Sequence, residues 1–427
     1  LEGNVDLSSF PNLKEFIGNN NDIKNIDISN IDNLRYFDVY DNLLTVFPDI
    51  NAHPYMNYFV CRNNLIQGKI PELSGNLFIE RFYCHDNLLT GEIPDTTLNQ
   101  SLSWLYCYNN NLSGFIPNLN TNIKHFKCFQ NPQITGEIPV LSSYTDLTLF
   151  DCYSCNLTGS IPDLSKNELL EQFKCFNNSL SGDIPDLSNN IKLEEFHCQQ
   201  NSLTGFNSTS LPTILTGFIA NENKLVENAV NSILQQLAAT VSINGRVDLL
   251  GPENSYPTGQ GLIDVETLTS RGWEVLVNDP PATIVLNPAE ADRTYSTVFS
   301  NDPPGGEYAR SMLDSDTAWV AGGFFSPQQW LQFDLGTILT VSGVVTQGRA
   351  NIGLPTFAPE WVTSYKVQYS NDDLNWNWVD NEYIFTGNID QNTKVTNTFD
   401  TSVLTRYLRI LPVAGAHPSM RAGVLIN

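Results

Sequence analysis

Apolar residues recur at fixed distances over the first half of the chain. Each unit has an aromatic residue or leucine as its anchor, with a second apolar residue three positions earlier and usually a third seven positions later. The alternation around each anchor predicts a short strand of period two, whose anchor and second-next residue point inward. The anchors are Phe16, Phe37, Phe59, Phe82, Leu105, Phe126, Phe150, Phe173, Phe196 and Phe218. They predict about ten stacked repeats, each burying its apolar face against its neighbours.

Three further residue types repeat in register with the anchors. Cysteine follows the anchor by two positions in seven units, and Cys107 and the others are expected to be reduced and buried, because neighbouring strands set them poorly for a disulfide torsion. Asparagine follows by five positions in most units, where its amide is expected to bond loop backbone, although Cys155 takes this place in the seventh unit. Proline recurs in a Gly-x-Ile-Pro corner, where its missing N–H is harmless.

The rhythm changes after residue 225. Val230, Ile233, Leu234 and Leu237 have helical spacing, which predicts a terminal cap, with Trp273 closing the open end. A proline-punctuated linker covers residues 279–293, and from about residue 285 short alternating strands predict an antiparallel sandwich or barrel. The predicted organisation is a solenoid over 1–225, a cap and linker over 226–284, and a second domain over 285–427. The fold class is mainly β with short turns.

The repeats resemble the leucine-rich-repeat family. The pattern L-x-x-L-x-L-x-x-N-x-L, extended by LxGxIP, is similar to the longer repeat type of plant receptors and of some bacterial surface proteins. The resemblance implies a solenoid whose strands line a concave face. Aromatic and histidine side chains at outward positions would form a stripe on that face, suited to sugar rings or protein hot spots, unless the rings only stack on one another. The candidate residues are Tyr40, Tyr58, Tyr83, His85, Trp104, Tyr106, Tyr108, Phe129, Tyr153 and Phe176.

Residues 285–427 resemble the discoidin, or coagulation factor type C, domain. The phrases "QWLQFDLG" (329–336), "WVTSYKVQYSNDDLNW" (361–376) and "RYLRILP" (406–412) carry the resemblance. It implies a β-sandwich jelly roll with loops at one end that bind glycans, phospholipid head groups, collagen or other receptors. The implied ligand-binding residues are Phe299, Phe324, Phe325, Arg349, Phe357 and Glu360. In the alternative, Arg349 and Glu360 pair with each other and the aromatic rings fold back to close the end of the domain.

Some discoidin-like sugar binders carry a structural calcium ion. Asp314, Asp316 and the backbone of Thr317 offer hard oxygen ligands at the matching place. Gly423 stands where calcium-binding relatives carry a glutamate, and the flanking cysteines of the family are absent. Both alternatives, a bound calcium ion and no cofactor, are therefore kept.

Charge and chemistry narrow the function further. The chain carries 46 acidic and 22 basic residues, a formal net charge of -24, which disfavours nucleic acid and anionic membrane lipid. Successive strand residues point to opposite faces, so Cys84 and His85 cannot share a metal, and the carboxylates show no distinctive pairing. We expect no catalytic residue. The first residues show no signal-peptide pattern, and we expect that targeting and capping segments are missing from this chain.

Three classes of function remain. The first is an extracellular or cell-surface binding and adhesion protein that recognises glycans or glycoproteins. The second is a receptor-binding or structural component of a virion or surface appendage. The third is the non-catalytic targeting part of a larger secreted enzyme.

Overall fold

The computed structural model describes residues 1–240, 242–280, 283–323, 325, 329–350 and 360–426. The chain forms two compact units, Leu1–Pro280 and Pro281–Asn427, and each is described by itself. No helix of the described residues is long and apolar enough to cross a membrane. Both units are built mainly from β-strands.

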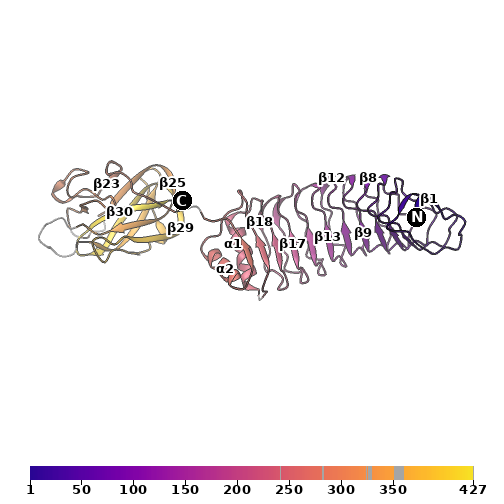
Figure 1. Ribbon diagram of the computed structural model, residues 1–427. Coiled ribbons are helices and arrows are strands. Elements are labelled where there is room, and N and C mark those ends of the chain that lie inside the picture. Colours follow the sequence, from indigo (N-terminus) through magenta and orange to yellow (C-terminus); the bar gives the residue numbers. More distant parts are fainter. Residues whose placement is uncertain (241, 281–282, 324, 326–328, 351–359, 427) are drawn as a thin grey trace. The chain divides into compact units, whose positions relative to one another are not determined.

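The first unit is a solenoid whose short strands form one parallel sheet of twelve strands (Figure 1). Neighbouring strands pair anchor to anchor, as Phe126 pairs with Phe150 and Phe150 with Phe173. The strands are β2 (Glu15–Ile17), β4 (Tyr36–Asp38), β5 (Tyr58–Val60), β7 (Arg81–Tyr83), β9 (Trp104–Tyr106), β11 (His125–Lys127), β13 (Leu149–Asp151), β15 (Gln172–Lys174), β17 (Glu195–His197), β19 (Gly217–Ile219), β20 (Arg246–Asp248) and β21 (Glu274–Leu276). The sheet thus continues for two strands beyond the ten anchored repeats.

The anchors form a continuous core along the solenoid. All of them are fully buried except Phe16, which is partly buried at the start of the array. Every cysteine is unpaired, and all but Cys155 are buried, which confirms the prediction for Cys107. The packing of each repeat on the next supplies the apolar contacts that a single short repeat cannot provide alone.

Each strand of the anchored repeats ends in the same way. The residue four positions after the anchor has φ between 50° and 57° in each of them, as at Asn109 and Ser154. The asparagine that follows is held by its neighbours: the Asn110 amide donates to the carbonyl oxygens of Cys84 and Cys107, both at 3.2 Å, and its Oδ1 accepts the N–H of Leu89 at 2.9 Å. The predicted asparagine column therefore satisfies backbone groups that would be buried without partners.

The chain then turns through the Gly-x-Ile-Pro corner. The glycine has φ near 80° at six such corners, as at Gly114 and Gly159, which explains its recurrence. A second parallel sheet forms beside these corners from β6 (Gln67–Gly68), β8 (Leu88–Gly91), β10 (Asn111–Gly114), β12 (Gln133–Glu137) and β14 (Asn156–Thr158). Two further pairs flank it: β1 (Glu2–Asp6) with β3 (Asp22–Asp27), and β16 (Ser181–Ile184) with β18 (Ser202–Phe206).

A second asparagine column, which we did not expect, lies six positions before the anchors. Its members Asn76, Asn99, Asn167 and Asn190 have no exposed surface. Each amide donates to carbonyl oxygens of the preceding repeat, as Asn99 does to Leu73 at 2.8 Å. These amide N–H groups therefore join the return sides of neighbouring repeats, but unlike Asn110 the side-chain oxygens of the four residues accept no hydrogen bond among the described residues.

The C-terminal end of the solenoid is covered by two helices. Helix α1 (Glu227–Ala239) confirms the predicted helical segment and buries Val230, Ile233 and Leu237. Helix α2 (Gln260–Ser270), which we did not predict, packs against it. Trp273 is 3% exposed, and its indole N–H donates to the Ser242 carbonyl oxygen at 3.1 Å, as expected for a residue that closes the core.

The second unit is a β-sandwich of discoidin type with antiparallel pairing throughout. Its strands are β22 (Ile284–Leu286), β23 (Arg293–Tyr295), β24 (Trp319–Val320), β25 (Leu331–Gln347), β26 (Val362–Ser370), β27 (Asn377–Trp378), β28 (Phe385–Thr386), β29 (Val395–Gly415) and β30 (Ser419–Ile426). The 3-10 turns are η1 (Glu290–Asp292), η2 (Phe299–Asn301) and η3 (Val379–Asn381). Strand β22, within the expected linker segment, pairs with β30. Trp319, Phe333, Tyr365 and Leu408 are among the core residues.

Candidate functional site

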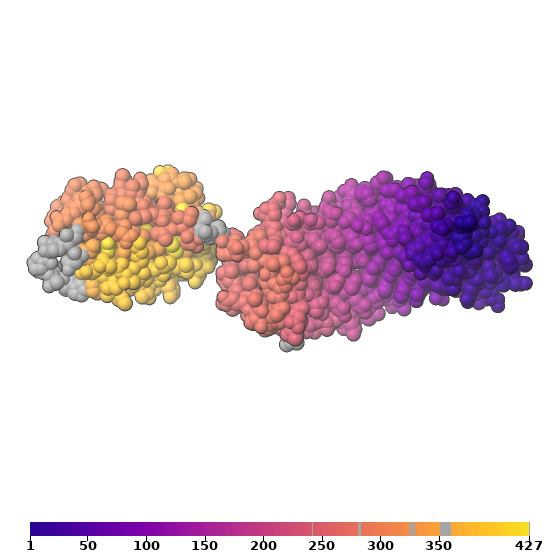
Figure 2. Space-filling model, viewed as in Figure 1, coloured from indigo at the N-terminus to yellow at the C-terminus, as the bar shows by residue number. Residues whose placement is uncertain are grey.

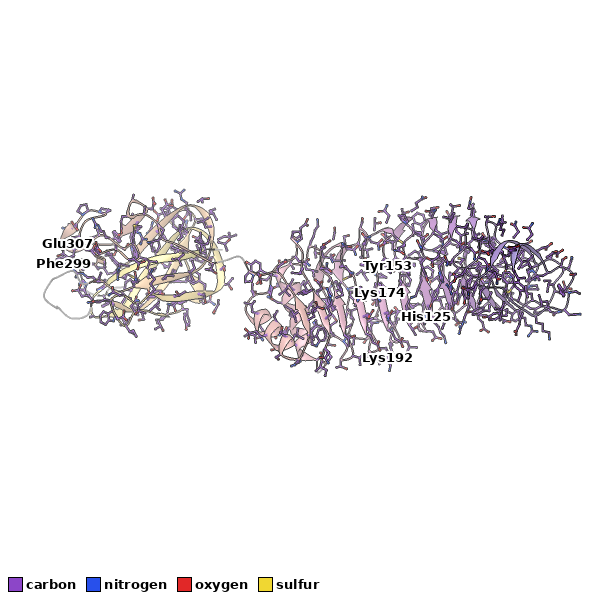
Figure 3. All side chains as sticks on the ribbon, in the orientation of Figure 1. His125, Tyr153, Lys174, Lys192, Phe299 and Glu307 are labelled. Atoms are coloured by element: carbon purple, nitrogen blue, oxygen red, sulfur yellow. The ribbon has the colours of Figure 1, made fainter. Side chains whose placement is uncertain are left out.

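The outward side chains of the twelve-stranded sheet form three columns, which together we call the concave face. They lie one position before, one position after and three positions after each anchor, and strand pairing places equivalent residues side by side. Neighbouring strands are about 4.8 Å apart, so flat side chains in one column can touch. Six of the ten predicted residues of this face lie in or just after strands β9 to β15, a region in which Figure 3 labels His125, Tyr153 and Lys174.

The third column is an unbroken stack of rings. His85 lies 4.1 Å from Tyr108 between ring centroids, and the stack then runs through Phe129, Tyr153 and Phe176 with spacings of 4.2, 4.2 and 4.1 Å. Tyr40 begins the same column, and the Arg62 guanidinium lies 3.9 Å above its ring. The rings therefore stack on one another, which is one of the two alternatives predicted from the sequence. Because their faces are covered by neighbouring rings, they present their edges to the outside.

His85 and Tyr83 are less exposed than predicted. Their exposed fractions are only 5% and 9%, because rings of adjacent repeats cover them, as Tyr106 covers Tyr83 at 4.6 Å. The His85 Nδ1 atom lies 2.8 Å from a carboxylate oxygen of Asp86. Burial still lowers the pKa of His85, since it penalises the imidazolium more than Asp86 stabilises it. His85 therefore supports the ring stack from below and offers little surface to a ligand.

The first column places one cation, Arg81, among aromatic and histidine rings. Tyr36 stacks on Tyr58 at 4.4 Å, and the Arg81 guanidinium lies 3.9 Å from the Trp104 ring centroid. The other side of the column continues with His125, which lies 4.6 Å from Trp104. Trp104 thus has a neighbour along the column in each direction, and Arg81 is held flat against it.

Charged residues follow the rings in the second column. Lys127 Nζ lies 3.4 Å from Asp151 Oδ2, and Lys174 Nζ lies 2.6 Å from Glu195 Oε2. Asp151 is 4% exposed, and burial raises the pKa of its carboxyl although Lys127 opposes this shift. Burial next to Lys174 lowers the pKa of His197 to about 4. The face therefore changes from aromatic to charged along the repeats.

Residues of the discoidin-like loops were predicted as the second site. Phe299 is 46% exposed and meets Tyr308 edge to face at 5.1 Å, and Figure 3 shows it at the same end of the unit as Glu307. Arg349 forms an ion pair with Glu360 and lies 5.5 Å from the Tyr308 ring centroid, so the self-pairing alternative is present. Phe325 is partly buried, and Phe324 and Phe357 lie outside the described residues.

Cationic side chains lie beside the candidate calcium residues, and the calcium site stays a prediction. Lys394 Nζ lies 2.6 Å from Asp314 Oδ2 and lowers the pKa of that carboxyl. Arg421 donates to the Ser315 carbonyl oxygen at 2.8 Å, and the Thr317 carbonyl oxygen accepts the Ser315 hydroxyl at 2.9 Å. Asp316 takes part in no group of three metal-ligating side chains among the described residues.

Sequence reasoning did not assign four residues that contact the candidate sites. Arg81, His125 and Lys127 lie on the concave face against Trp104 or Tyr106, and Tyr308 lies between Phe299 and Arg349. The signal for the first three was available, because they occupy the same positions beside the anchor as the aromatic candidates. Tyr308 had no repeat register to reveal it.

Comparison with known proteins adds the following. The F5/8 type C domain model matches residues 295–424. Lactadherin of Sus scrofa is 41% identical over 119 residues, which cover 25% of this chain and 26% of lactadherin. Retinoschisin of Mus musculus is 38% identical over 150 residues, which cover 33% of this chain and 60% of retinoschisin. The chain thus matches about a quarter of one relative and three fifths of the other.

Two solved structures resemble different parts of the chain. The Arabidopsis receptor kinase HAESA, in complex with the peptide hormone IDA and a co-receptor, has a TM-score of 0.49 at 22% identity, covering 62% of this chain and 46% of that chain. Discoidin II of Dictyostelium discoideum has a TM-score of 0.24 at 24% identity, covering 31% of this chain and 48% of that chain. The family match gives the assignment: residues 295–424 belong to the F5/8 type C, or discoidin, domain family, and they follow a solenoid of parallel strands whose repeats are rich in leucine and asparagine.

Proposed function

We propose that this protein is an extracellular binding and adhesion protein that recognises glycans or glycoproteins of a cell surface. Two surfaces carry the recognition: the concave face of the solenoid and the loop end of the F5/8 type C domain. The observation on which the proposal rests most is the unbroken stack from His85 to Phe176, with spacings of 4.1 to 4.2 Å.

The stack suits recognition because its side chains are held before a ligand arrives. A ring fixed between two others loses little conformational freedom on binding, so less of the contact energy is spent on ordering. Ring edges and hydroxyl groups remain available; the Tyr153 hydroxyl makes no hydrogen bond with the described residues, and Tyr153 is partly exposed. A polar edge beside an apolar edge matches the surface of a saccharide, which carries hydroxyl groups around a C–H framework.

The loop end of the F5/8 type C domain offers a second set of preorganised groups. Phe299 is exposed, and Tyr308 contacts both Phe299 and Arg349. The ion pair with Glu360 fixes the Arg349 guanidinium, whose remaining N–H groups can donate to hydroxyl or carboxylate oxygens. The proposal assigns no catalytic residue on either surface.

A glycan array probed with the full chain, with and without a chelator, tests the proposal. We expect retention of a defined set of glycans, with no effect of the chelator because Lys394 already pairs with Asp314. Trp104→Ala and Phe299→Ala remove one hot-spot ring from each surface, and each is expected to weaken binding by about tenfold or more. Phe115→Ala, at a 67% exposed ring after β10, is the matched control and should bind normally.

The proposal fails if the folded full chain binds neither arrayed glycans nor the surface of any cell type tested. Loss of binding in the Phe115→Ala control, equal to the loss in the other two variants, would also count against it. A response of only one of the two surface variants would assign recognition to that surface.

A further inference from the structure

The centre of the concave face has a charge opposite to that of the chain as a whole. The chain has a formal net charge of -24. In the three columns across strands β5 to β15, all of which the structure describes, the cations are Arg62, Arg81, Lys127 and Lys174, and the carboxylate is Asp151. A positive patch within an acidic surface is the arrangement expected where an anionic partner has to be drawn to one place.

A compact group of side chains lies in the middle of this patch, and we call it the cationic cluster. It consists of Arg81, Trp104, Tyr106, His125 and Lys127. Trp104 has the Arg81 guanidinium at 3.9 Å on one side and the His125 ring at 4.6 Å on the other. The Tyr106 hydroxyl lies 2.9 Å from His125 Nδ1, and Lys127 Nζ lies 5.3 Å from the Tyr106 ring centroid.

The charges of the cluster are only partly neutralised by the protein. Arg81 forms no ion pair with a carboxylate of the described residues, and rings rather than acids hold it in place. Lys127 has Asp151 as its partner, at 3.4 Å. Burial lowers the pKa of His125, and the nearby Lys127, Arg81 and Lys124 lower it further, which fits a local excess of positive charge.

The donors of the cluster point to an oxygen-rich anion. Arg81 supplies a planar guanidinium whose orientation the indole fixes, and Lys127 supplies a point charge two strands away, about 10 Å from it at about 4.8 Å per strand. When the Tyr106 hydroxyl donates to His125 Nδ1, the His125 Nε2 atom carries a proton and can donate between the two cations. Both side chains reach toward rings of the strand between them, so the two charges can be contacted by one short oligosaccharide.

We infer that the cationic cluster is the specificity site of the concave face, and that it binds the carboxylate or sulfate groups of an acidic saccharide. The inference rests on the proposed function, because it names the class of glycan that the concave face recognises. Acidic peptides share the anionic groups, but they lack the ring of hydroxyl groups that the His125 Nε2–H donor and the Tyr106 hydroxyl oxygen, as an acceptor, can address.

Affinity of the full chain for four soluble probes tests the inference: a sulfated chondroitin oligosaccharide, an unsulfated hyaluronan oligosaccharide, a neutral glucan oligosaccharide of equal length, and polyglutamate. We expect binding of at least one acidic saccharide, weakened by added salt, and much weaker binding of the glucan and polyglutamate. The two acidic arms distinguish a sulfate from a carboxylate as the recognised group.

Charge-removing variants locate the site. Arg81→Gln and Lys127→Gln should each lower the affinity for the acidic saccharide by about tenfold, the value of one hydrogen bond to a charged group. Arg81→Lys keeps the charge and should retain more affinity than Arg81→Gln. Lys166→Gln and Lys192→Gln remove the same charge from exposed residues outside the concave columns, and both variants should bind as the unaltered chain does. Figure 3 labels Lys192.

The possible outcomes separate this inference from the proposed function. Equal binding of neutral and acidic saccharides, or equal losses in the cluster variants and the two controls, would overturn the inference while glycan binding stands. Preference for polyglutamate over both acidic saccharides would also overturn it. Failure to bind any glycan would remove the proposed function as well. Melting temperatures identify misfolded variants. If Lys127→Gln unfolds the repeat because Asp151 loses its ion-pair partner, the comparison of Arg81→Gln with Arg81→Lys still tests the inference.

Discussion

The two units satisfy their buried polar groups in opposite ways. In the solenoid, an asparagine such as Asn110 bonds to backbone of its own repeat and to Cys84 of the preceding repeat, 26 residues away. In the F5/8 type C unit, Arg293 reaches the Ala422 carbonyl oxygen 129 residues away, and Arg421 reaches Ser315 across 106 residues. Figure 2 shows the same contrast, since colour changes steadily along the solenoid while orange and yellow atoms lie together in the other unit.

This difference indicates how each unit responds to damage. A solenoid distributes its stability over contacts between neighbouring repeats, so the loss of one polar staple is shared by two repeats. The stability of the sandwich depends more strongly on each of its few hydrogen-bonded side chains that join distant segments, such as Arg293 and Arg421. The predictions below test this contrast, from the largest expected effect to the smallest.

Replacing Arg421 by methionine should have the largest effect on stability. Arg421 is 3% exposed and donates to the carbonyl oxygens of Gly348, Ser315 and Gln391 at 2.7 to 2.8 Å. The variant leaves three carbonyl groups without a partner, so the free energy of unfolding of the F5/8 type C unit should fall by about 4 kcal/mol. Differential scanning calorimetry of the full chain would show one transition at a lower temperature.

Arg406→Met is the matched control. Arg406 pairs with both carboxylate oxygens of Asp334 at 2.9 and 3.0 Å, but on the surface, where such a pair contributes about 0 to 1 kcal/mol. A comparable destabilisation by both variants would contradict the role given to Arg421. If the solenoid transition moved together with that of the other unit, the two units would not unfold independently.

Replacing Asn110 by alanine should destabilise the solenoid by about 2 to 3 kcal/mol. The variant leaves the Leu89 N–H buried without a partner and removes one of the two amide donors of the Cys84 carbonyl oxygen, which keeps the Asn87 amide. Urea denaturation monitored by tyrosine and tryptophan fluorescence measures the change. Asn122→Ala, which removes an exposed amide that donates to the Gln100 carbonyl oxygen, should change stability by less than about 0.5 kcal/mol.

The pH dependence of solenoid stability should become flatter in His197→Gln. The folded state lowers the pKa of His197 to about 4, first through burial and then through Lys174, whereas an unfolded histidine titrates near 6.5. The unfolded state therefore binds more protons between about pH 6.5 and 4, and stability falls as the pH decreases through this range. The contribution is about 1 kcal/mol after allowance for solvent screening. Urea titrations at pH 7 and pH 4.5 compare the two chains, and parallel losses would contradict the assignment.

Thiol labelling should single out Cys155 with almost no change in stability. Its thiol is partly exposed, and a hydrogen bond with Cys128 lowers its pKa, whereas burial raises the pKa of the seven other cysteines. A maleimide should react quickly with one thiol of the folded chain, and Cys155→Ser should abolish this reaction. Rapid labelling of several thiols in the folded chain would show that the repeats open locally.

The same contrast explains what the sequence could predict. In the solenoid, equivalent residues of successive repeats lie side by side. The repeated sequence pattern therefore predicts the strand, the buried anchor and the asparagine column of each repeat. The strands Arg246–Asp248 and Glu274–Leu276 escaped prediction because they lack an aromatic anchor and its asparagine. The second asparagine column escaped because Tyr144 interrupts it, with its hydroxyl accepting the Leu119 N–H at 3.0 Å.

The candidate sites were harder to predict than the fold. Positions on the concave face followed from the repeat, but the burial of His85 depends on how rings of two neighbouring repeats stack, which no single repeat encodes. In the F5/8 type C unit, Lys394 and Arg421 come close to Asp314 and Ser315 only after folding, so these cations beside the candidate calcium residues could not be predicted from the sequence. The resemblance to discoidin domains indicated where the loops lie in the sequence. Which of their side chains pair with each other, as Arg349 does with Glu360, became known only from the structure.

The ring stack also sets the bend of the solenoid. Tyr153 and Phe176 are 4.1 Å apart, whereas Phe150 and Phe173, the anchors of the same two repeats, are 5.7 Å apart. Each repeat is therefore a wedge whose thin edge is one aromatic ring thick. Rings in van der Waals contact cannot approach further. The arc thus has a minimum radius fixed by ring thickness, and a partner has to match this radius, because the solenoid cannot tighten around it.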